Sequence, residues 1–148
     1  MAQASPLLGR VVHVADGDTV TVMDAHHASY RIRLAGIDAP EKRQPWGKVS
    51  AYALSERVAG QEVKVLWHKR DRYHRLVGVV LVGGVDAGLA QISEGLAWHY
   101  VAYEREQIPE DRARYASAEA KARAQGSGLW RDPAPIPPWE WRRSHRRH

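Results

Sequence analysis

Three short segments near the start of the chain alternate apolar or β-branched side chains with polar ones. They are Gly9 to Val14, Thr19 to Asp24 and Tyr30 to Leu34. A period of two is typical of strands. The Asp16-Gly17 pair favours a tight hairpin between the first two segments, and Pro40 ends the third because proline cannot donate to a ladder. The sequence therefore predicts a three-stranded meander.

The rest of the chain adds helices and two more strands. A helix is expected at 47–58, strands at 62–67 and 76–82, and helices at 85–94 and 111–125. In the first helix Val49, Tyr52, Ala53 and Val58 are expected to share a face. The element order β3-α-β2-α-α predicts an α+β fold, a five-stranded OB-fold β-barrel with about three helices.

The length of 148 residues, with 44% hydrophobic content, fits one domain that buries its own core. We expect an N-terminal extension at 1–8, the barrel domain at 9–131, and an extended proline- and tryptophan-rich strap with a basic tail at 132–148. The strap's tryptophans are expected to pin it to the body. The net charge is +5, but four arginines lie from Arg142 onwards. Net charge therefore gives no argument for a polyanionic partner.

Composition excludes several kinds of site. The absence of cysteine excludes disulfides, thiolate metal sites and cysteine nucleophiles. The apolar run from Leu76 to Val85 is too short to cross a bilayer as a helix. We expect any secretion signal to be absent or already removed, since no basic-then-apolar leader opens the chain. None of the eight histidines forms the i, i+4 helical pair of a zinc protease.

Three acidic residues follow turns or strand ends in the meander. Asp18 lies just past the tight turn, and Asp38 and Glu41 lie just past the third strand. If the strands pair, these carboxylates converge at one rim of the barrel and offer the hard oxygen ligands that suit calcium or magnesium. The alternative for each acid is a turn role, accepting backbone N–H groups. Asp16 fits that alternative best.

Two arginines, Arg31 and Arg33, share one face of the third strand. A solvated polar face is one interpretation. The functional one is that Arg33 presents its planar fork to a phosphate beside the metal. Arg75 lies beyond a charged bend, residues 71–75, that can fold over the same rim.

Three runs of the sequence closely resemble the catalytic blocks of the thermonuclease, or staphylococcal-nuclease-like, family. They are Val-Ala-Asp-Gly-Asp-Thr-Val at 14–20, Arg-Leu-Ala-Gly-Ile-Asp-Ala-Pro-Glu at 33–41 and Asp-Arg-Tyr-His-Arg-Leu at 71–76. Further runs at 94–98, 119–123 and 128–130 follow in the family's order. Pro-Pro-Trp-Glu-Trp-Arg at 137–142 resembles the tail of many bacterial members. The resemblance covers nearly the whole chain.

The resemblance implies a metal site. Asp18 and Asp38 would bind Ca²⁺ through their side chains, and Ala39 through its backbone carbonyl. Family members often have threonine at the position of Ala39, but a backbone ligand does not depend on the side chain. Glu41 would act as the general base or orient the attacking water.

The resemblance also implies phosphate and nucleotide contacts. Arg33 and Arg75 would neutralise the charge of the transition state. Contacts to the nucleotide are implied for Arg72, Tyr73 and Tyr103. The implied activity is hydrolysis of DNA and RNA that leaves a 3′-phosphate, with single or frayed strands as substrate because a rim site must grip one backbone.

Three classes of function are therefore weighed. The first is a calcium-dependent endonuclease, favoured because the chain keeps all five catalytic positions. The second is an OB-type module that holds single strands or a protein ligand without cutting, and the third is an oligosaccharide or lipid-surface binder. We expect DNA and RNA as partners, no membrane, no obligate protein partner and a monomer. A nuclease endangers its own cell, which favours secretion or the periplasm over the cytoplasm.

Overall fold

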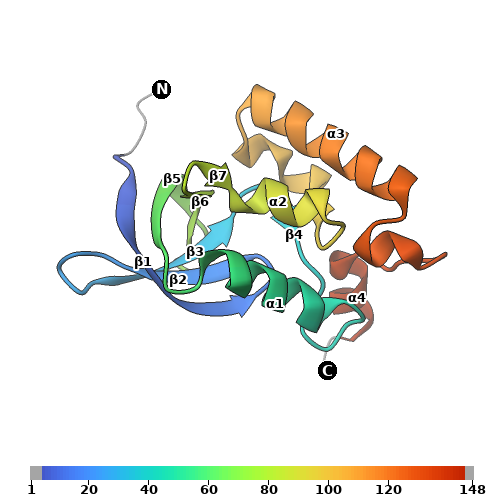
Figure 1. Cartoon of the computed structure of the whole chain (residues 1–148), viewed down its shortest axis with the longest axis horizontal. Coiled ribbons are helices and arrows are strands. Elements are labelled where there is room, and N and C mark those ends of the chain that lie inside the picture. Colours follow the sequence, from blue (N-terminus) through green and yellow to red (C-terminus); the bar gives the residue numbers. More distant parts are fainter. Residues whose placement is uncertain (1–4, 146–148) are drawn as a thin grey trace.

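A closed β-barrel forms the body of the protein. The structure, a computed structural model, describes residues 5–145. In this range five strands make the barrel (Figure 1): β1 (Leu7–Asp16), β2 (Thr19–Met23), β3 (Ser29–Leu34), β5 (Glu62–Arg70) and β6 (Leu76–Val82). They follow the order β3-β2-β1-β5-β6 with antiparallel neighbours, and a parallel pairing of β3 with β6 closes the barrel. The predicted five-stranded barrel is confirmed.

Helices cover one side of the barrel. Figure 1 shows α3 and α4 on the right, with α1 and α2 nearer to the strands. The described helices are α1 (Gly47–Val58), α2 (Ala87–Ser93), α3 (Pro109–Gln125), α4 (Pro138–Ser144) and the 3₁₀ helices η1 (Val101–Glu106) and η2 (Gly128–Arg131). No helix within residues 5–145 has the length and apolar character needed to cross a membrane.

Short strands in the structure differ from the elements predicted from the sequence. Residues 85–86, expected to begin a helix, form β7 (Val85–Asp86), and the carboxylate of Asp86 then caps α2 by accepting from Leu89 N at 3.0 Å. β4 (Ile37–Asp38) pairs with β8 (Trp98–His99). This small pairing lies between the barrel and the helices and places Asp38 opposite Trp98.

The core lies inside the barrel and beneath α1 and α2. It is built from apolar side chains such as Val20, Ile32, Leu34, Leu54, Val58 and Ile92. The predicted face of α1 was wrong in part. Val49 and Tyr52 are 49% and 67% exposed, and the buried face instead includes Ser50 and Leu54 with Val58, because residues four apart stack on one side of a helix.

The C-terminal strap is partly helical, so the expectation of a wholly extended segment was wrong. Pro138 opens α4, a position that tolerates proline because the first helical N–H has no partner in any case. Trp139 stacks on Tyr100 with ring centroids 5.1 Å apart and meets the edge of Trp98 at 5.5 Å. Trp139 therefore pins the strap, whereas Trp141 stacks on His145 within the strap itself.

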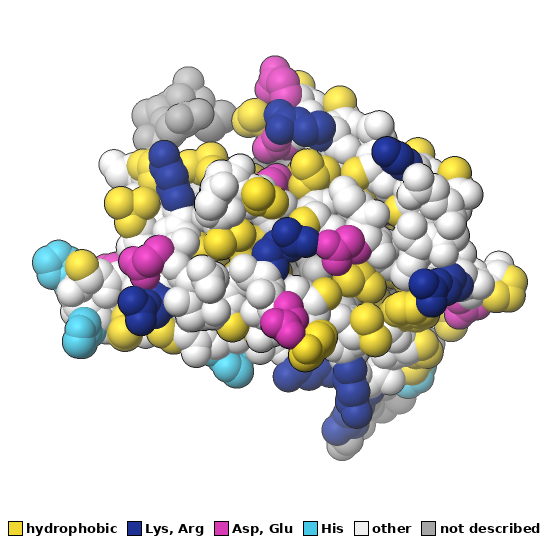
Figure 2. All heavy atoms as spheres, viewed as in Figure 1, with side chains coloured by type: hydrophobic (Ala, Val, Ile, Leu, Met, Phe, Trp, Pro, Cys, Tyr) yellow, Lys and Arg dark blue, Asp and Glu magenta, His cyan; other side chains and the backbone are white. Residues whose placement is uncertain are grey.

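The predicted ends of the domain differ slightly from the structure. β1 begins at Leu7, two residues before the expected start of the barrel domain. Residues 1–4 of the expected extension and 146–148 of the basic tail lie outside the described residues. On the face shown in Figure 2, basic side chains are interspersed with acidic ones, and the largest basic group lies beside the C-terminal end.

Candidate active site

An open hollow of about 1240 Å³ lies where the barrel rim, the 71–75 bend, η1 and α4 meet. It gathers the side chains predicted for catalysis, metal binding and nucleotide contact: Asp18, Arg33, Asp38, Glu41, Arg72, Tyr73, Arg75 and Tyr103. Ala39 is buried behind them. Elements from both ends of the chain thus bring the predicted side chains to one place.

The turn between β1 and β2 fixes the first acid. Asp16 has the turn role expected for it, because its carboxylate accepts from Asp18 N at 3.1 Å. The carboxylate of Asp18 accepts from Ala39 N at 2.8 Å and from Thr19 Oγ1 at 3.0 Å. This links the turn directly to the chain that follows β4, as strand pairing predicted.

A buried polar network holds this turn against the helices. Gln91 Nε2 donates to Gly17 O and to Ser50 O, both at 3.0 Å, and Ser50 Oγ donates to Leu96 O at 2.7 Å. A Cβ added to Gly17 would overlap Ser50 Oγ, so only glycine lets the turn approach α1 this closely. The position of Asp18 therefore depends on contacts to α1 and α2.

The two buried acids have unusual proton affinities. Burial raises the pKa of Asp18 to about 8, and the neighbouring charge of Asp16 adds to this. Burial also raises the pKa of Asp38 to about 6, against the lowering effect of Arg142, with further repulsion from Asp18 and Glu41. Carboxylates in this state gain from any cation that binds between them.

The two arginines predicted for catalysis are held by acids. Arg33 on β3 is 8% exposed, its guanidinium binds Glu106, and its Nε lies 3.9 Å from Asp71 Oδ2. Arg75 Nε donates to Asp71 Oδ2 at 2.8 Å. Asp71 also accepts from the backbone N–H groups of Tyr73 and Arg75. Burial raises its pKa, but these hydrogen bonds outweigh burial and leave the pKa below the usual value.

The predicted nucleotide contacts flank the hollow. Tyr103 stacks on Tyr100 with centroids 4.5 Å apart, and the guanidinium carbon of Arg33 lies 5.6 Å from the Tyr103 ring centroid. Tyr73 is 52% exposed and lies between the guanidinium groups of Arg72 and Arg75, at 5.0 and 5.3 Å. Arg72 and Tyr73 are thus placed on a solvent-facing edge, and Tyr103 beside the buried arginine.

Two residues of the hollow were missed from the sequence. Glu106 binds Arg33 and also Lys69 Nζ, at 3.2 Å. Arg142 on α4 binds both Asp38 and Glu41. No local pattern marks Glu106. The Pro-Pro-Trp-Glu-Trp-Arg run was the one signal for Arg142, which was predicted only as part of the basic tail.

The predicted metal ligands are few. Among the described residues, no group of three or more histidine, aspartate or glutamate side chains is arranged to hold an ion. The candidate donors are therefore two carboxylates, Asp18 and Asp38, which backbone and water oxygens would have to complete, and such hard oxygen donors are the kind that calcium prefers. In this structure Asp38 pairs with the guanidinium of Arg142.

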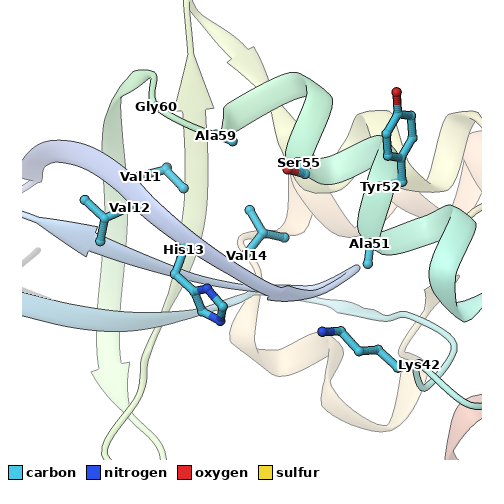
Figure 3. Close-up of a pocket in the computed structure, with 10 residues that line it drawn as sticks. All are labelled: Val11, Val12, His13, Val14, Lys42, Ala51, Tyr52, Ser55, Ala59 and Gly60. Atoms are coloured by element: carbon cyan, nitrogen blue, oxygen red, sulfur yellow. The ribbon is translucent and has the colours of Figure 1, made fainter.

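A second hollow, of about 470 Å³, lies between β1 and α1 (Figure 3). Its walls are mostly small or apolar, with His13, Lys42, Tyr52 and Ser55 as the polar contributions. No carboxylate lines it among the described residues, so it offers no metal ligands of the kind found at the barrel rim.

Comparisons with known proteins point to nucleases. Residues 31–132 match the family model described as staphylococcal nuclease homologue. An uncharacterized endonuclease of Escherichia coli is 42% identical over 135 residues, which cover 90% of this chain and 84% of that protein. A micrococcal nuclease of Shigella flexneri is 39% identical over 145 residues, covering 92% and 80%. A staphylococcal-like nuclease of Arabidopsis thaliana is 43% identical over 117 residues, covering 79% and 34%.

Proposed function

Because this chain belongs to the staphylococcal nuclease family, we propose that it is a calcium-dependent endonuclease acting on DNA and RNA. Hydrolysis of nucleic acids is the activity that its relatives' names support. The observation that carries the proposal is the single hollow that gathers two buried carboxylates, Glu41 and two arginines. An OB-type module that only binds strands has no need of that combination.

Asp18 and Asp38, with the backbone carbonyl of Ala39, are the proposed ligands of the ion. A bound calcium would act as a Lewis acid on the phosphate and on the attacking water. The raised pKa values of Asp18 and Asp38 support this assignment, because a cation relieves the repulsion between buried carboxylates.

Glu41 is the proposed general base. Its side chain is 39% exposed at the edge of the hollow, where water reaches it. One carboxylate oxygen within a hydrogen bond of the water is enough to accept its proton. No side-chain nucleophile is needed, since water attacks phosphorus directly.

Arg33 and Arg75 supply fixed positive charge for the transition state. Arg33 is nearly buried and held by Glu106, and Arg75 is held by Asp71, so both guanidinium groups are preorganised. One preorganised donor of this kind is worth about 3 kcal/mol in the transition state. Together, the two arginines would account for much of the rate enhancement that water and metal alone do not give.

The proposed substrate is a single or frayed strand of either sugar type. Tyr103 and the 71–75 bend line the hollow beside the carboxylates, and a site at a barrel rim grips one backbone more easily than a paired duplex. The proposed groups act on phosphate and water, which are common to DNA and RNA, and this supports action on both. The family resemblance supports 3′-phosphate products. Because a free nuclease endangers its own cell, the proposed location is outside the cell or in the periplasm. The proposed oligomeric state is a monomer.

The test is digestion of denatured DNA and RNA with calcium, with magnesium and with a chelator, followed by end-group analysis. Glu41→Gln, Arg33→Ala and Arg75→Ala should each lower turnover by several orders of magnitude while the fold is retained. Activity that persists in chelator contradicts the metal assignment. Normal strand binding without cleavage by the wild-type protein supports the binding-module alternative instead.

A further inference from the structure

The last described helix places a cation on the proposed metal ligands. Arg142 Nη2 donates to Asp38 Oδ2 at 2.7 Å, and Nη1 donates to Asp38 Oδ1 at 3.1 Å. Nη1 also donates to Glu41 Oε2 at 3.2 Å. A fork of two N–H groups on one carboxylate is the strongest form of this ion pair.

The position of Arg142 is built into the fold. Trp139, one turn earlier on α4, stacks on Tyr100 at 5.1 Å, and Gln44 Nε2 donates to the carbonyl of Ile136 at 2.6 Å. Gln44 is itself buried, so the end of this contact that lies on the body of the protein is fixed. These contacts hold α4 in place independently of the carboxylates. The side chain of Arg142 is 39% exposed, so its guanidinium has solvent to turn into without a shift of α4.

Calcium and this guanidinium would compete for Asp38. Both oxygens of Asp38 already accept from Arg142. A calcium ion bound by Asp38 would draw on the same carboxylate charge, and the two positive charges would repel. Loading of the site is therefore opposed for as long as the guanidinium stays on Asp38.

We propose that Arg142 is a further residue of the metal site, one that sets its calcium affinity by competing with calcium for Asp38. The inference rests on the proposed function, since it takes Asp38 as a calcium ligand. A guanidinium that occupies Asp38 about 90% of the time lowers the apparent calcium affinity about tenfold. In exchange, it stabilises the buried carboxylate of the metal-free protein.

The test is calcium binding to the full chain by titration calorimetry. Arg142→Gln should bind calcium about tenfold more tightly than the wild type. Arg142→Lys should be intermediate, because an ammonium keeps the charge but loses the fork. Arg143 is exposed on the same helix, so Arg143→Gln is the matched control for charge and should stay within about twofold of wild type. Circular dichroism melts establish that each variant is folded.

A second readout follows the guanidinium itself. The Nη–H signals of Arg142 are identified in NMR spectra as those that Arg142→Lys lacks. In the wild type they should report a restrained guanidinium without calcium and should be averaged by rotation at saturating calcium. Signals that stay unchanged at saturating calcium overturn the proposal. So does an Arg142→Gln variant whose calcium affinity is equal to or lower than that of the wild type. If these results come with normal calcium-dependent digestion, the proposed function stands and the inference alone fails. If neither the wild type nor Arg142→Gln binds calcium and DNA is cut in chelator, the metal assignment fails together with the inference.

Discussion

Glu106 holds the guanidinium of Arg33 by a side-chain hydrogen bond, although 73 residues separate Glu106 and Arg33 in sequence. The side chains of Glu106 and Arg33 are 6% and 9% exposed, so neither has much water to replace its partner. A buried pair that loses one member leaves an uncompensated charge. Glu106 is therefore a positioning residue for the guanidinium that is proposed to meet the phosphate.

Glu106→Ala should destabilise the protein by about 3 kcal/mol, which lowers its melting temperature by roughly 6–12 °C. Turnover should fall at least tenfold with little change in KM, because Arg33 loses its fixed orientation. Glu106→Gln keeps a hydrogen-bond acceptor and should recover part of both losses. Calorimetry and steady-state kinetics on the two variants check this, and an Ala variant with unchanged melting and turnover would refute it.

Arg75→Lys separates charge from geometry at the second arginine. Lysine keeps the positive charge but cannot present a planar fork to Asp71 and a phosphate together. Turnover should fall by about 10²-fold, less than for Arg75→Ala, in line with the loss of one preorganised donor. Kinetics on denatured DNA measure the difference. Equal rates for the Lys variant and the wild type would mean that charge alone is needed.

The raised pKa of Asp18 predicts that the metal-free protein loses stability as pH rises. The unfolded carboxyl has a pKa of 3.8, and the folded one about 8, so the folded state binds the extra proton between these values. Stability then falls with increasing pH across this window. Melting temperatures measured in chelator from pH 4 to about pH 8 test whether stability falls as pH rises.

Asp18→Asn should flatten this pH dependence, because the amide does not titrate. Glu110→Gln, an exposed change on α3, is the control and should leave the slope as in wild type. Saturating calcium should reverse the trend in the wild type, since the ion binds the deprotonated carboxylates. A wild-type melting temperature that rises with pH in chelator would contradict the assignment.

Gln91→Leu tests the network beneath the β1–β2 turn. The change leaves the carbonyl of Gly17 without the Gln91 donor, which costs about 1–3 kcal/mol, and it removes a second hydrogen bond to the carbonyl of Ser50. Urea unfolding should show a lower midpoint with an unchanged slope. Calcium affinity should weaken as well, because Asp18 is placed by this turn. An unchanged midpoint would show that water replaces the amide.

The barrel could be predicted because its strands carry a period of two over five or more residues. Strands of two residues, such as β4 and β7, carry no such signal. The face of α1 was misjudged because Ser50 is buried by a hydrogen bond to Leu96 rather than by its own character. Polar residues of this kind are buried by partners that are distant in sequence, which a local pattern cannot reveal.

The same reason explains which parts of the site were missed. Asp18, Asp38 and Arg33 lie at strand ends, where alternation and turn chemistry fix their direction. Arg142 reaches Asp38 across 104 residues, and that pairing exists only once α4 has docked. The sequence run around Arg142 identified the segment, but no rule of residue spacing could predict that its side chain binds Asp38 and Glu41.

The parallel pairing of β3 with β6 has a consequence for how activity and folding are coupled. Arg33 stands opposite Val77 in that pairing, so the strand that bears the guanidinium is also the seam that closes the barrel. A pairing this distant in sequence closes a long loop, and the packing of the whole barrel has to offset that loss of entropy. A chain in which this seam is open therefore has no fixed Arg33. Loss of cleavage on heating should then coincide with global unfolding of the barrel, with no milder inactivation preceding it.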